Sequence, residues 1–273
     1  MPPANAPRVS VMMPVLDPHP VYFPAAVASV LAQTAADLEL IIVEDPSATR
    51  ADRVASLDDP RIRYIRNDAR TSLVDQRNRA LAEARADIVA MLDADDIAEP
   101  DRFVKQLAFL DARPEIGLVG SQLTIIDGGG DVIGSRSYPL EHADIVAAMC
   151  RYNAIAQPAV MARKRVIVDA GGYQYRTFPV NEDYELWSRL VQRGVRVANH
   201  PDVLLRYRVH RSGTKAAMLR RMLRATLDVK NQFWRDKMDA RARLRFWGEH
   251  MLVGLPPSWV LKLFVAIQYD GRP

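Results

Sequence analysis

The sequence predicts an α/β protein whose mostly parallel sheet is flanked by helices. Continuous apolar runs that end abruptly in polar residues, as at residues 8–16 and 86–96, are typical of buried parallel strands. Segments with helical spacing of apolar residues alternate with these runs, beginning at residues 22–34. No internal repeat or low-complexity tract interrupts the alternation. Strands and helices that alternate in this way build a layered sheet.

The first elements form a strand–helix–strand unit. "RVSVMMPVL" (residues 8–16) is an apolar strand that ends at Asp17-Pro18, and "YFPAAVASVLAQT" (22–34) follows with the spacing of a helix. "LELIIVEDPS" (38–47) is a second strand, which ends in acidic residues and a proline turn. This unit predicts a parallel pair of strands joined by a right-handed crossover.

Further strands and helices follow in the order expected of the same sheet. Pro100 stands where a first-turn proline is favoured, so a helix is predicted from there to about Ala112. The other expected elements are a short strand at 61–68, a helix at 72–85, strands at 86–96 and 116–127, and a hairpin turn with a returning edge strand at 128–139.

Composition favours one large domain or a domain with an appendage. The chain has 273 residues, of which 49% are hydrophobic, and its net charge is +4 from 37 basic and 33 acidic residues. This mild, mixed charge gives no reason to expect nucleic-acid binding. After about Thr214 the sequence becomes helical throughout and rich in Arg and Met. We therefore expect a sheet domain at residues 1–213 and a helical C-terminal extension at 214–273.

The cysteine content and the N-terminus predict a cytoplasmic protein. Cys150 is the only cysteine, so the chain forms no internal disulfide and fits a reducing compartment. "MPPANAPR" lacks the apolar segment of a secretory signal.

The C-terminal extension leaves two interpretations open. Six arginines, three aromatic residues and the stretch 252–267 suit an anionic membrane surface, which would make the protein peripheral on the inner leaflet. Alternatively, the helices pack on the sheet domain or on another subunit of a homo-oligomer. The stretch 251–267 is interrupted by glycine, prolines and lysine and is too short for a spanning helix, so we interpret it as an amphipathic or interfacial element. The arginines are Arg220, Arg221, Arg224, Arg241, Arg243 and Arg245, and the aromatic residues are Trp234, Phe246 and Trp247.

Acidic residues follow three of the predicted strands. In open α/β sheets, ligands bind beyond the carboxyl ends of the strands, so these residues are expected to share one rim. Oxygen ligands at Asp95 and Asp96 suit Mg²⁺ or Mn²⁺, which substrate phosphates would complete. A second interpretation is that both residues only solvate the loop before the helix at Pro100. The strand ends are Leu16-Asp17, Glu44-Asp45 and Asp93-Ala94-Asp95-Asp96.

A second acidic pair, Glu182-Asp183, precedes a predicted helix. Glu182 is a suitable helix cap, which leaves Asp183 to face a cleft as a general base for a sugar hydroxyl. Further on, "LLRYRVHRSGTK" ends a strand with arginines and His210, which indicates diphosphate recognition.

Seven motifs in order make the chain resemble the family 2 glycosyltransferases. They cover about residues 8 to 212 and read "VSVMMPVLD", "SVLAQT", "LELIIVEDPS", "RNRALAEARADIVAMLDADD", "EPDRF", "NEDYELWSRL" and "LLRYRVH". The resemblance implies the GT-A fold, which is Rossmann-like, and inverting, metal-dependent transfer from a UDP-, GDP- or dTDP-sugar donor. The implied acceptor is a glycan or a lipid-linked molecule.

The resemblance also implies roles for single residues. Pro14, Leu16 and Asp17 at one strand end, with Glu44 and Asp45 at the next, correspond to the nucleobase and ribose contacts. Asp93-Ala94-Asp95 corresponds to the DxD element, with Asp95 and Asp96 closest to diphosphate and to Mn²⁺ or Mg²⁺.

The remaining roles fall in the second half of the match. Asp183, beside Glu182, corresponds to the catalytic base, and His210 to a late diphosphate or metal contact, with Arg208 on the donor side. Arg77 lies in the family's "ARN" element, where it faces the donor or forms a salt bridge on the helix surface; both interpretations stay open.

Departures from the family pattern affect the nucleotide preference and the acceptor contacts. "EDPS" replaces the usual "DDGS", Asp17 stands where Asn is common, and "QPA" (157–159) replaces "HPS". A non-catalytic nucleotide-sugar-binding homologue therefore stays open as an alternative. A sugar nucleotidyltransferase lacks support because no glycine-rich basic loop follows the first strand, and a dehydrogenase because no G-x-G-x-x-G does.

Overall fold

A single mixed sheet organises the protein. The computed structural model describes residues 6–35, 37–174, 180–209 and 215–254. In this part of the chain nine strands form one sheet, in the order β3-β2-β1-β4-β8-β6-β9-β5, with β7 paired to β6. The strands are β1 (Val9–Val15), β2 (Leu38–Glu44), β3 (Ile62–Arg66), β4 (Ile88–Met91), β5 (Ile97–Ala98), β6 (Ile116–Ile126), β7 (Val132–Arg136), β8 (Met161–Arg163) and β9 (Arg196–Arg208).

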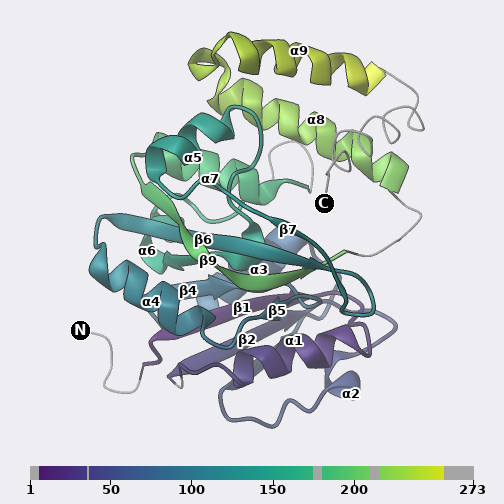
Figure 1. The fold of residues 1–273 in the computed structure, drawn as a ribbon. Helices are drawn as coiled ribbons and strands as arrows, with labels where there is room; N and C mark the ends of the chain where they lie inside the picture. The colour runs from purple at the N-terminus through teal and green to yellow at the C-terminus, as the bar shows by residue number, and fades with distance from the viewer. Residues whose placement is uncertain (1–5, 36, 175–179, 210–214, 255–273) are drawn as a thin grey trace.

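Helices cover both faces of this sheet (Figure 1). Alternate residues of β1 and β2 belong to two separate hydrophobic clusters, one on each face. Helices α1, α2 and α4 contribute to one cluster, and α3 and α5 to α9 to the other. The helices are α1 (Tyr22–Leu31), α2 (Ala51–Val54), α3 (Leu73–Glu83), α4 (Arg102–Ala112), α5 (His142–Met149), α6 (Lys164–Asp169), α7 (Glu182–Gln192), α8 (Lys215–Phe233) and α9 (Ala240–Gly254), with short 3₁₀ turns η1 (Gln157–Ala159) and η2 (Arg235–Lys237).

The predicted α/β class with a mostly parallel sheet is confirmed. β1 pairs in parallel with β2 and β4, β2 with β3, and β6 with β9. The hairpin is also confirmed, since β7 returns antiparallel beside β6. Strand β8, which lies antiparallel between β4 and β6, was not predicted. A strand of three residues is too short to show a periodic pattern.

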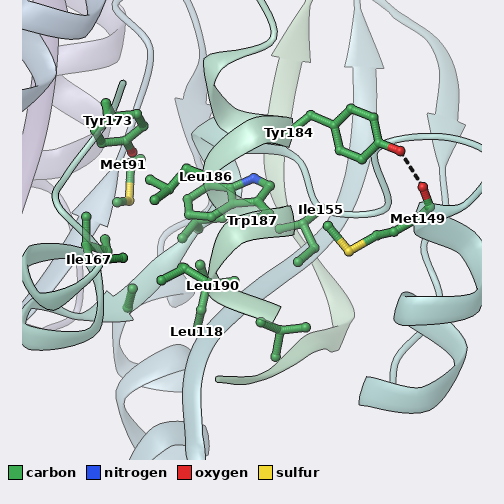
Figure 2. Packing of buried hydrophobic residues seen from close by; sticks show 14 of the residues in the cluster. Met91, Leu118, Met149, Ile155, Ile167, Tyr173, Tyr184, Leu186, Trp187 and Leu190 are labelled. Carbon is green, nitrogen blue, oxygen red and sulfur yellow. Dashed lines mark hydrogen bonds between the residues drawn. The ribbon is translucent and has the colours of Figure 1, made fainter. Parts of the chain in front are cut away.

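Helix α7 is largely buried on its face of the sheet, with eight of its 11 residues buried. Its side chains Trp187 and Leu190 pack against Leu118 of β6 and the neighbouring core residues (Figure 2). The hydroxyl of Tyr184, in the first turn of α7, donates a hydrogen bond to the carbonyl of Met149 at the end of α5. The start of α7 is therefore held in place by packing and by a buried hydrogen bond.

The C-terminal helices pack on the sheet domain through a buried tryptophan. Trp234 is 0% exposed, and its indole Nε1 donates to Ser188 Oγ of α7 at 2.8 Å. Phe246 of α9 is also buried. Of the two interpretations of the extension, the one that places Trp234 and Phe246 on a membrane is therefore wrong for these two residues, because both complete the core that α7, α8 and α9 share. Trp247, by contrast, is exposed.

The remaining expectations concern the C-terminal half of the chain. No helix among the described residues is long and apolar enough to cross a membrane. The amphipathic stretch expected at 251–267 lies mostly outside the described residues, which end at 254. The division of the chain at residues 213 and 214 stays a prediction.

Candidate active site

Parallel pairing brings the ends of β1, β2 and β4 to one edge of the sheet. Val15 lies opposite Glu44, and Met12 lies opposite Met91. The acidic residues that follow these strands therefore lie along a common rim, as the sequence predicted.

The end of β1 presents its side chains to solvent in a constrained backbone. Pro14 is buried within the strand, whereas Leu16 and Asp17 are exposed. Asp17 has a φ of 51°, in the left-handed region that Asp tolerates better than most residues. Its backbone N–H donates to Ser47 Oγ at 3.2 Å, which ties the β1 loop to the loop after β2.

Glu44 at the end of β2 is buried and bonded within the protein. The carboxylate of Glu44 accepts hydrogen bonds from the backbone N–H of Ala51 at 3.0 Å and from the Tyr64 hydroxyl. Glu44 therefore fixes the start of α2. A contact between Glu44 and a donor nucleotide stays a prediction.

Asp45 fixes the loop that leads into α3. Its carboxylate accepts from Asn67 Nδ2 at 2.6 Å and from the backbone N–H of Thr71 at 2.7 Å. Burial acts to raise the pKa of Asp45, but hydrogen bonds from Asn67, Gln76 and Thr71 outweigh it and lower the pKa. Asp45 is therefore held ionised at the rim.

The acidic loop after β4 contains one buried and two half-buried carboxylates. Asp93 and Asp95 are half-buried, while Asp96 is only 1% exposed. Asp96 Oδ1 accepts the backbone N–H of Arg208 at 2.8 Å, whereas Oδ2 has no hydrogen-bond partner among the described residues. Burial, and then repulsion from Asp93 and Asp95, raises the pKa of Asp96 well above its usual range. Ionisation of one carboxylate in this loop therefore makes ionisation of its neighbours less favourable.

Arg208 at the end of β9 fastens this loop to its surroundings. Its Nε donates to the carbonyl of Asp95 and its Nη1 to the carbonyl of Asp127, both at 2.9 Å. The guanidinium lies 4.4 Å from the ring centroid of Tyr22, which in turn stacks on His19. Arg208 is thus placed beside the acidic loop, although its guanidinium donates to backbone carbonyls in the part of the chain that the structure describes.

Arg77 connects the acidic loop to helix α7. It is 4% exposed and forms ion pairs with Glu182 and, at 3.3 Å, with Asp93. Its guanidinium lies 5.5 Å from the ring centroid of Tyr173, whose hydroxyl accepts from Gln157 Nε2 at 2.8 Å. The interpretation of Arg77 as a helix-surface salt bridge is wrong, because α3 directs it into the protein. Its donor contact stays a prediction.

Asp183 lies in the first turn of α7, next to the Arg77 ion pairs. Burial, and then the neighbouring Glu182 carboxylate, raises the pKa of Asp183 to about 7. Asn153 Nδ2 donates to Asp183 Oδ2 at 2.9 Å. A carboxylate with a pKa near 7 accepts a proton more readily than an ordinary aspartate, as a general base requires.

The backbone before α7 is braced by α8. Asn181 has a φ of 61°, and its Nδ2 donates to the carbonyl of Met222 at 3.0 Å and to Thr226 Oγ1 at 2.7 Å. These bonds hold the turn that presents Asp183 to the site.

Asp95 fits a divalent cation that a substrate would help to hold. Among the described residues, no three Asp, Glu, His or Cys side chains gather closely enough to form a metal site on their own. Mg²⁺ and Mn²⁺ commonly take one or two carboxylates and complete their shell with water and phosphate oxygens. The raised pKa values of Asp93 and Asp96 show carboxylates whose mutual repulsion a cation would offset. His210 lies outside the described residues.

Three contacts of the site were not predicted. Asn153, Gln157 and Tyr173 come from the segment between β7 and α7, and each reaches Asp183 or Arg77 directly or through one neighbour. The replacement of "HPS" by "QPA" marks Gln157 in the sequence, but nothing there indicates its bond to Tyr173.

Comparisons with known proteins identify the family to which the chain is similar. The family model for glycosyl transferase family 2 matches residues 10–170. An uncharacterized glycosyltransferase of Haemophilus influenzae is 30% identical over 78% of this chain and 68% of its own length. The Escherichia coli protein WfaP, named as a UDP-Glc:alpha-D-GlcNAc-diphosphoundecaprenol beta-1,3-glucosyltransferase, is 28% identical over 76% of this chain and 80% of its own.

A solved structure shows the same fold. Residues 1–349 of S. aureus TarS, in complex with UDP, match with a TM-score of 0.62 at 15% identity, over 81% of this chain and 65% of that chain. A second TarS structure contains UDP-GlcNAc and matches with a TM-score of 0.61. Together with the family model, these similarities show that the chain belongs to glycosyl transferase family 2, has the GT-A fold and is a glycosyltransferase.

Proposed function

We propose that the protein transfers a sugar from a nucleotide diphosphate donor to an acceptor hydroxyl with inversion at the anomeric carbon. The observation that carries this proposal is Asp183, a carboxylate with its pKa raised to about 7, placed beside the Arg77 bridge to the acidic loop. Asp183 removes the acceptor hydroxyl proton as that oxygen bonds to the anomeric carbon. The bond from this carbon to the diphosphate breaks on the opposite face, and the nucleoside diphosphate leaves.

The donor side of the site is assigned to the rim of the sheet. Leu16 and Asp17 are exposed there, while Pro14 shapes the strand end and Glu44 and Asp45 fix the adjacent loops. This placement suits a nucleobase and ribose above the ends of β1 and β2. A UDP-, GDP- or dTDP-sugar is proposed as donor, and the TarS complexes with UDP and UDP-GlcNAc favour the uridine nucleotides.

Asp95 is proposed to hold the metal on the diphosphate side. When bound, Mn²⁺ or Mg²⁺ would neutralise charge on the departing diphosphate. Asp93, bound to Arg77, and Asp96, bound to the backbone of Arg208, position the loop that carries Asp95. Asp96 and His210 remain proposed as further metal contacts.

A glycan or lipid-linked molecule is proposed as the acceptor, bound on the side of Asp183 that faces away from the donor. The name of WfaP includes a diphosphoundecaprenol-linked sugar, so a lipid-linked acceptor is included in the proposal. It would be met at the cytoplasmic face of a membrane, on which the protein is proposed to be peripheral. Assembly into a homo-oligomer is proposed as the alternative role of the C-terminal extension.

Ligand-dependent stabilisation tests the donor assignment. The midpoint of thermal unfolding is measured with a panel of nucleotide sugars, each with and without Mn²⁺. A donor at about 100 times its Kd is expected to add about 2.7 kcal/mol to the free energy of unfolding. The proposal requires one nucleotide sugar to stabilise the protein more with Mn²⁺ than without it. An identical, unshifted midpoint across the panel would contradict the proposal.

A further inference from the structure

Helix α9 has an exposed apolar face directly opposite its packed face. Ala242 and Phe246 are buried against the rest of the protein. Leu244, Trp247 and Met251 are 75%, 66% and 74% exposed. Their spacing of three and four residues places the three exposed side chains along one stripe of the helix.

The composition of this outward face is unusual for a helix in contact with water. By helical spacing, Ala240 and Gly248 share this side of the helix with the three exposed side chains, so the stripe contains no charged or polar residue. Single exposed apolar residues are common, but a contiguous stripe that includes a tryptophan indicates a surface that is covered in use. Leu244, Trp247 and Met251 form the α9 stripe.

Cationic residues flank the α9 stripe on both sides. Arg241 and Arg245 lie along one flank of the helix and Arg243 along the other, and all three are exposed. Glu249 is the only acidic residue of α9, and it lies toward the packed side, where it pairs with the buried Lys230 at 2.6 Å and with Arg245 at 2.9 Å. The outward surface of α9 is therefore apolar along its centre and positive at its edges.

The position of α9 in the fold exposes this surface. α9 lies beyond α8 on the side of the molecule away from α1 and α2, and forms the outermost layer there (Figure 1). The packed side of α9 contributes to the same cluster as α8, so the α9 stripe faces away from the protein.

Charge distinguishes the candidates that would cover the stripe. A second copy that used the same face would bring arginines against arginines, because a two-fold interface joins identical surfaces. Residues 255–273 contain Lys262, Arg272 and one acid, Asp270, so they offer no negative charge in excess. An anionic lipid surface supplies both acyl chains for the stripe and negative headgroups for the flanking arginines.

We propose that the α9 stripe inserts into the interface of a bilayer that contains anionic lipid, with Arg241, Arg243 and Arg245 at the headgroups. This docking is independent of the catalytic proposal and requires no donor or acceptor. It places the membrane against the layer next to α8, whose Met222 and Thr226 hold the turn before Asp183. A lipid-linked acceptor would thus be collected at the surface that carries α9.

Vesicle flotation of the full chain tests the proposal. The protein is floated with vesicles of phosphatidylcholine alone and of phosphatidylcholine with phosphatidylglycerol, and binding is expected only to the anionic vesicles. Changing the whole stripe (Leu244→Gln, Trp247→Gln, Met251→Gln) is expected to weaken binding on the order of a hundredfold. The double change Arg241→Gln with Arg243→Gln is expected to weaken vesicle binding by about fivefold per arginine. Added salt is expected to weaken binding to a similar extent, because it screens the same charges.

A matched variant controls for the loss of exposed apolar area. Val104 on α4 and Val168 on α6 are 45% and 50% exposed, and changing both to Gln removes apolar surface from helices elsewhere on the protein. This control is expected to bind anionic vesicles as the natural protein does. The unfolding midpoints of all variants, measured without vesicles, show that each variant is folded.

A fluorophore at the stripe distinguishes the membrane from the other occupants. Trp247→Cys is labelled with an environment-sensitive dye; the one natural cysteine, Cys150, is buried. The proposal predicts water-like emission in buffer and a blue shift on anionic vesicles. Blue-shifted emission in buffer at all concentrations would show that residues 255–273 cover the stripe. A shift that grows with protein concentration would show a second copy. Either result, or vesicle binding unchanged by the stripe variant, overturns the proposal.

Discussion

Arg77 on α3 and Glu182 on α7 form a buried ion pair between residues 105 positions apart. The same guanidinium reaches Asp93 in the acidic loop. Burial alone would lower the pKa of Arg77, but Asp93 and Glu182 raise it above the ordinary value for arginine. One cation therefore fixes the relative position of the loop proposed to hold the metal and the helix proposed to carry the base.

Removing this cation is expected to destabilise the fold. Arg77→Met leaves the buried Glu182 and the half-buried Asp93 without their counter-charge, a change that typically costs about 3–5 kcal/mol of the free energy of unfolding. For a chain of this size the unfolding midpoint should fall by about 10 °C. Adding Glu182→Gln to Arg77→Met should restore part of the loss, because the unpaired carboxylate is then gone.

An exposed pair provides the control for this measurement. Arg8 and Asp111 form an ion pair at 2.8 Å with side chains 56% and 61% exposed. Arg8→Met should change the free energy of unfolding by less than about 1 kcal/mol. An equally small effect of Arg77→Met would show that the buried bridge does not hold the site together.

The rate of transfer should rise with pH through about neutrality. Asp183 acts as a base only when ionised, and burial and Glu182 raise its pKa to about 7. Activity is therefore expected above that pH and should decline as pH falls through it, roughly tenfold per unit at the acid limb. A profile of kcat/KM against pH, which reports the free enzyme, checks this. A profile that stays flat from pH 5 to about 8 would contradict the assignment.

Asp95→Ala should remove the dependence of donor binding on metal. The natural protein is expected to show a higher unfolding midpoint with UDP and Mn²⁺ together than with either alone, since ligands that bind the folded state stabilise it. In Asp95→Ala this synergy should disappear. Asp202→Ala, which changes a surface carboxylate paired with Lys105, should retain it. Full synergy in Asp95→Ala would place the metal elsewhere.

Two tryptophans of the C-terminal extension should differ sharply in their effect on stability. Trp234 is 0% exposed and bonded to Ser188, so Trp234→Ala should lower the free energy of unfolding by about 3–5 kcal/mol. Trp247 is 66% exposed, so Trp247→Ala should change it by about 0.5 kcal/mol or less. Equal effects would mean that α8 and α9 do not pack as described. Because both variants replace a tryptophan with alanine, a difference between them reflects burial and not residue type.

The central strands and their acidic ends were predictable because their pattern is local. The strands at residues 9–15 and 88–91 are almost wholly apolar because both faces of a parallel strand are buried. The convergence of Asp17, Asp45 and Asp95 then follows from parallel pairing alone. The fold class and the common edge at which these acidic residues lie could therefore be derived from the sequence.

Other features left no local pattern. Glu182, one of the two partners of Arg77, lies 105 positions away from it, and the sequence around either residue does not indicate the other. β8 has only three residues, and Asn153 lies in a segment without clear periodicity. In α9 apolar residues occur on two opposite sides, so the sequence did not show that Phe246 packs inward while Trp247 faces out.

The most direct test of the account is the turnover of Asp183→Asn. Release of nucleoside diphosphate is measured with the donor that stabilises the protein and with alpha-D-GlcNAc-diphosphoundecaprenol among the acceptors. We expect kcat to fall by about 10²–10⁴ while donor binding, measured by thermal shift, is unchanged. Asp202→Asn should keep full activity. Turnover of Asp183→Asn equal to that of the natural protein would contradict the assignment of Asp183 as the base.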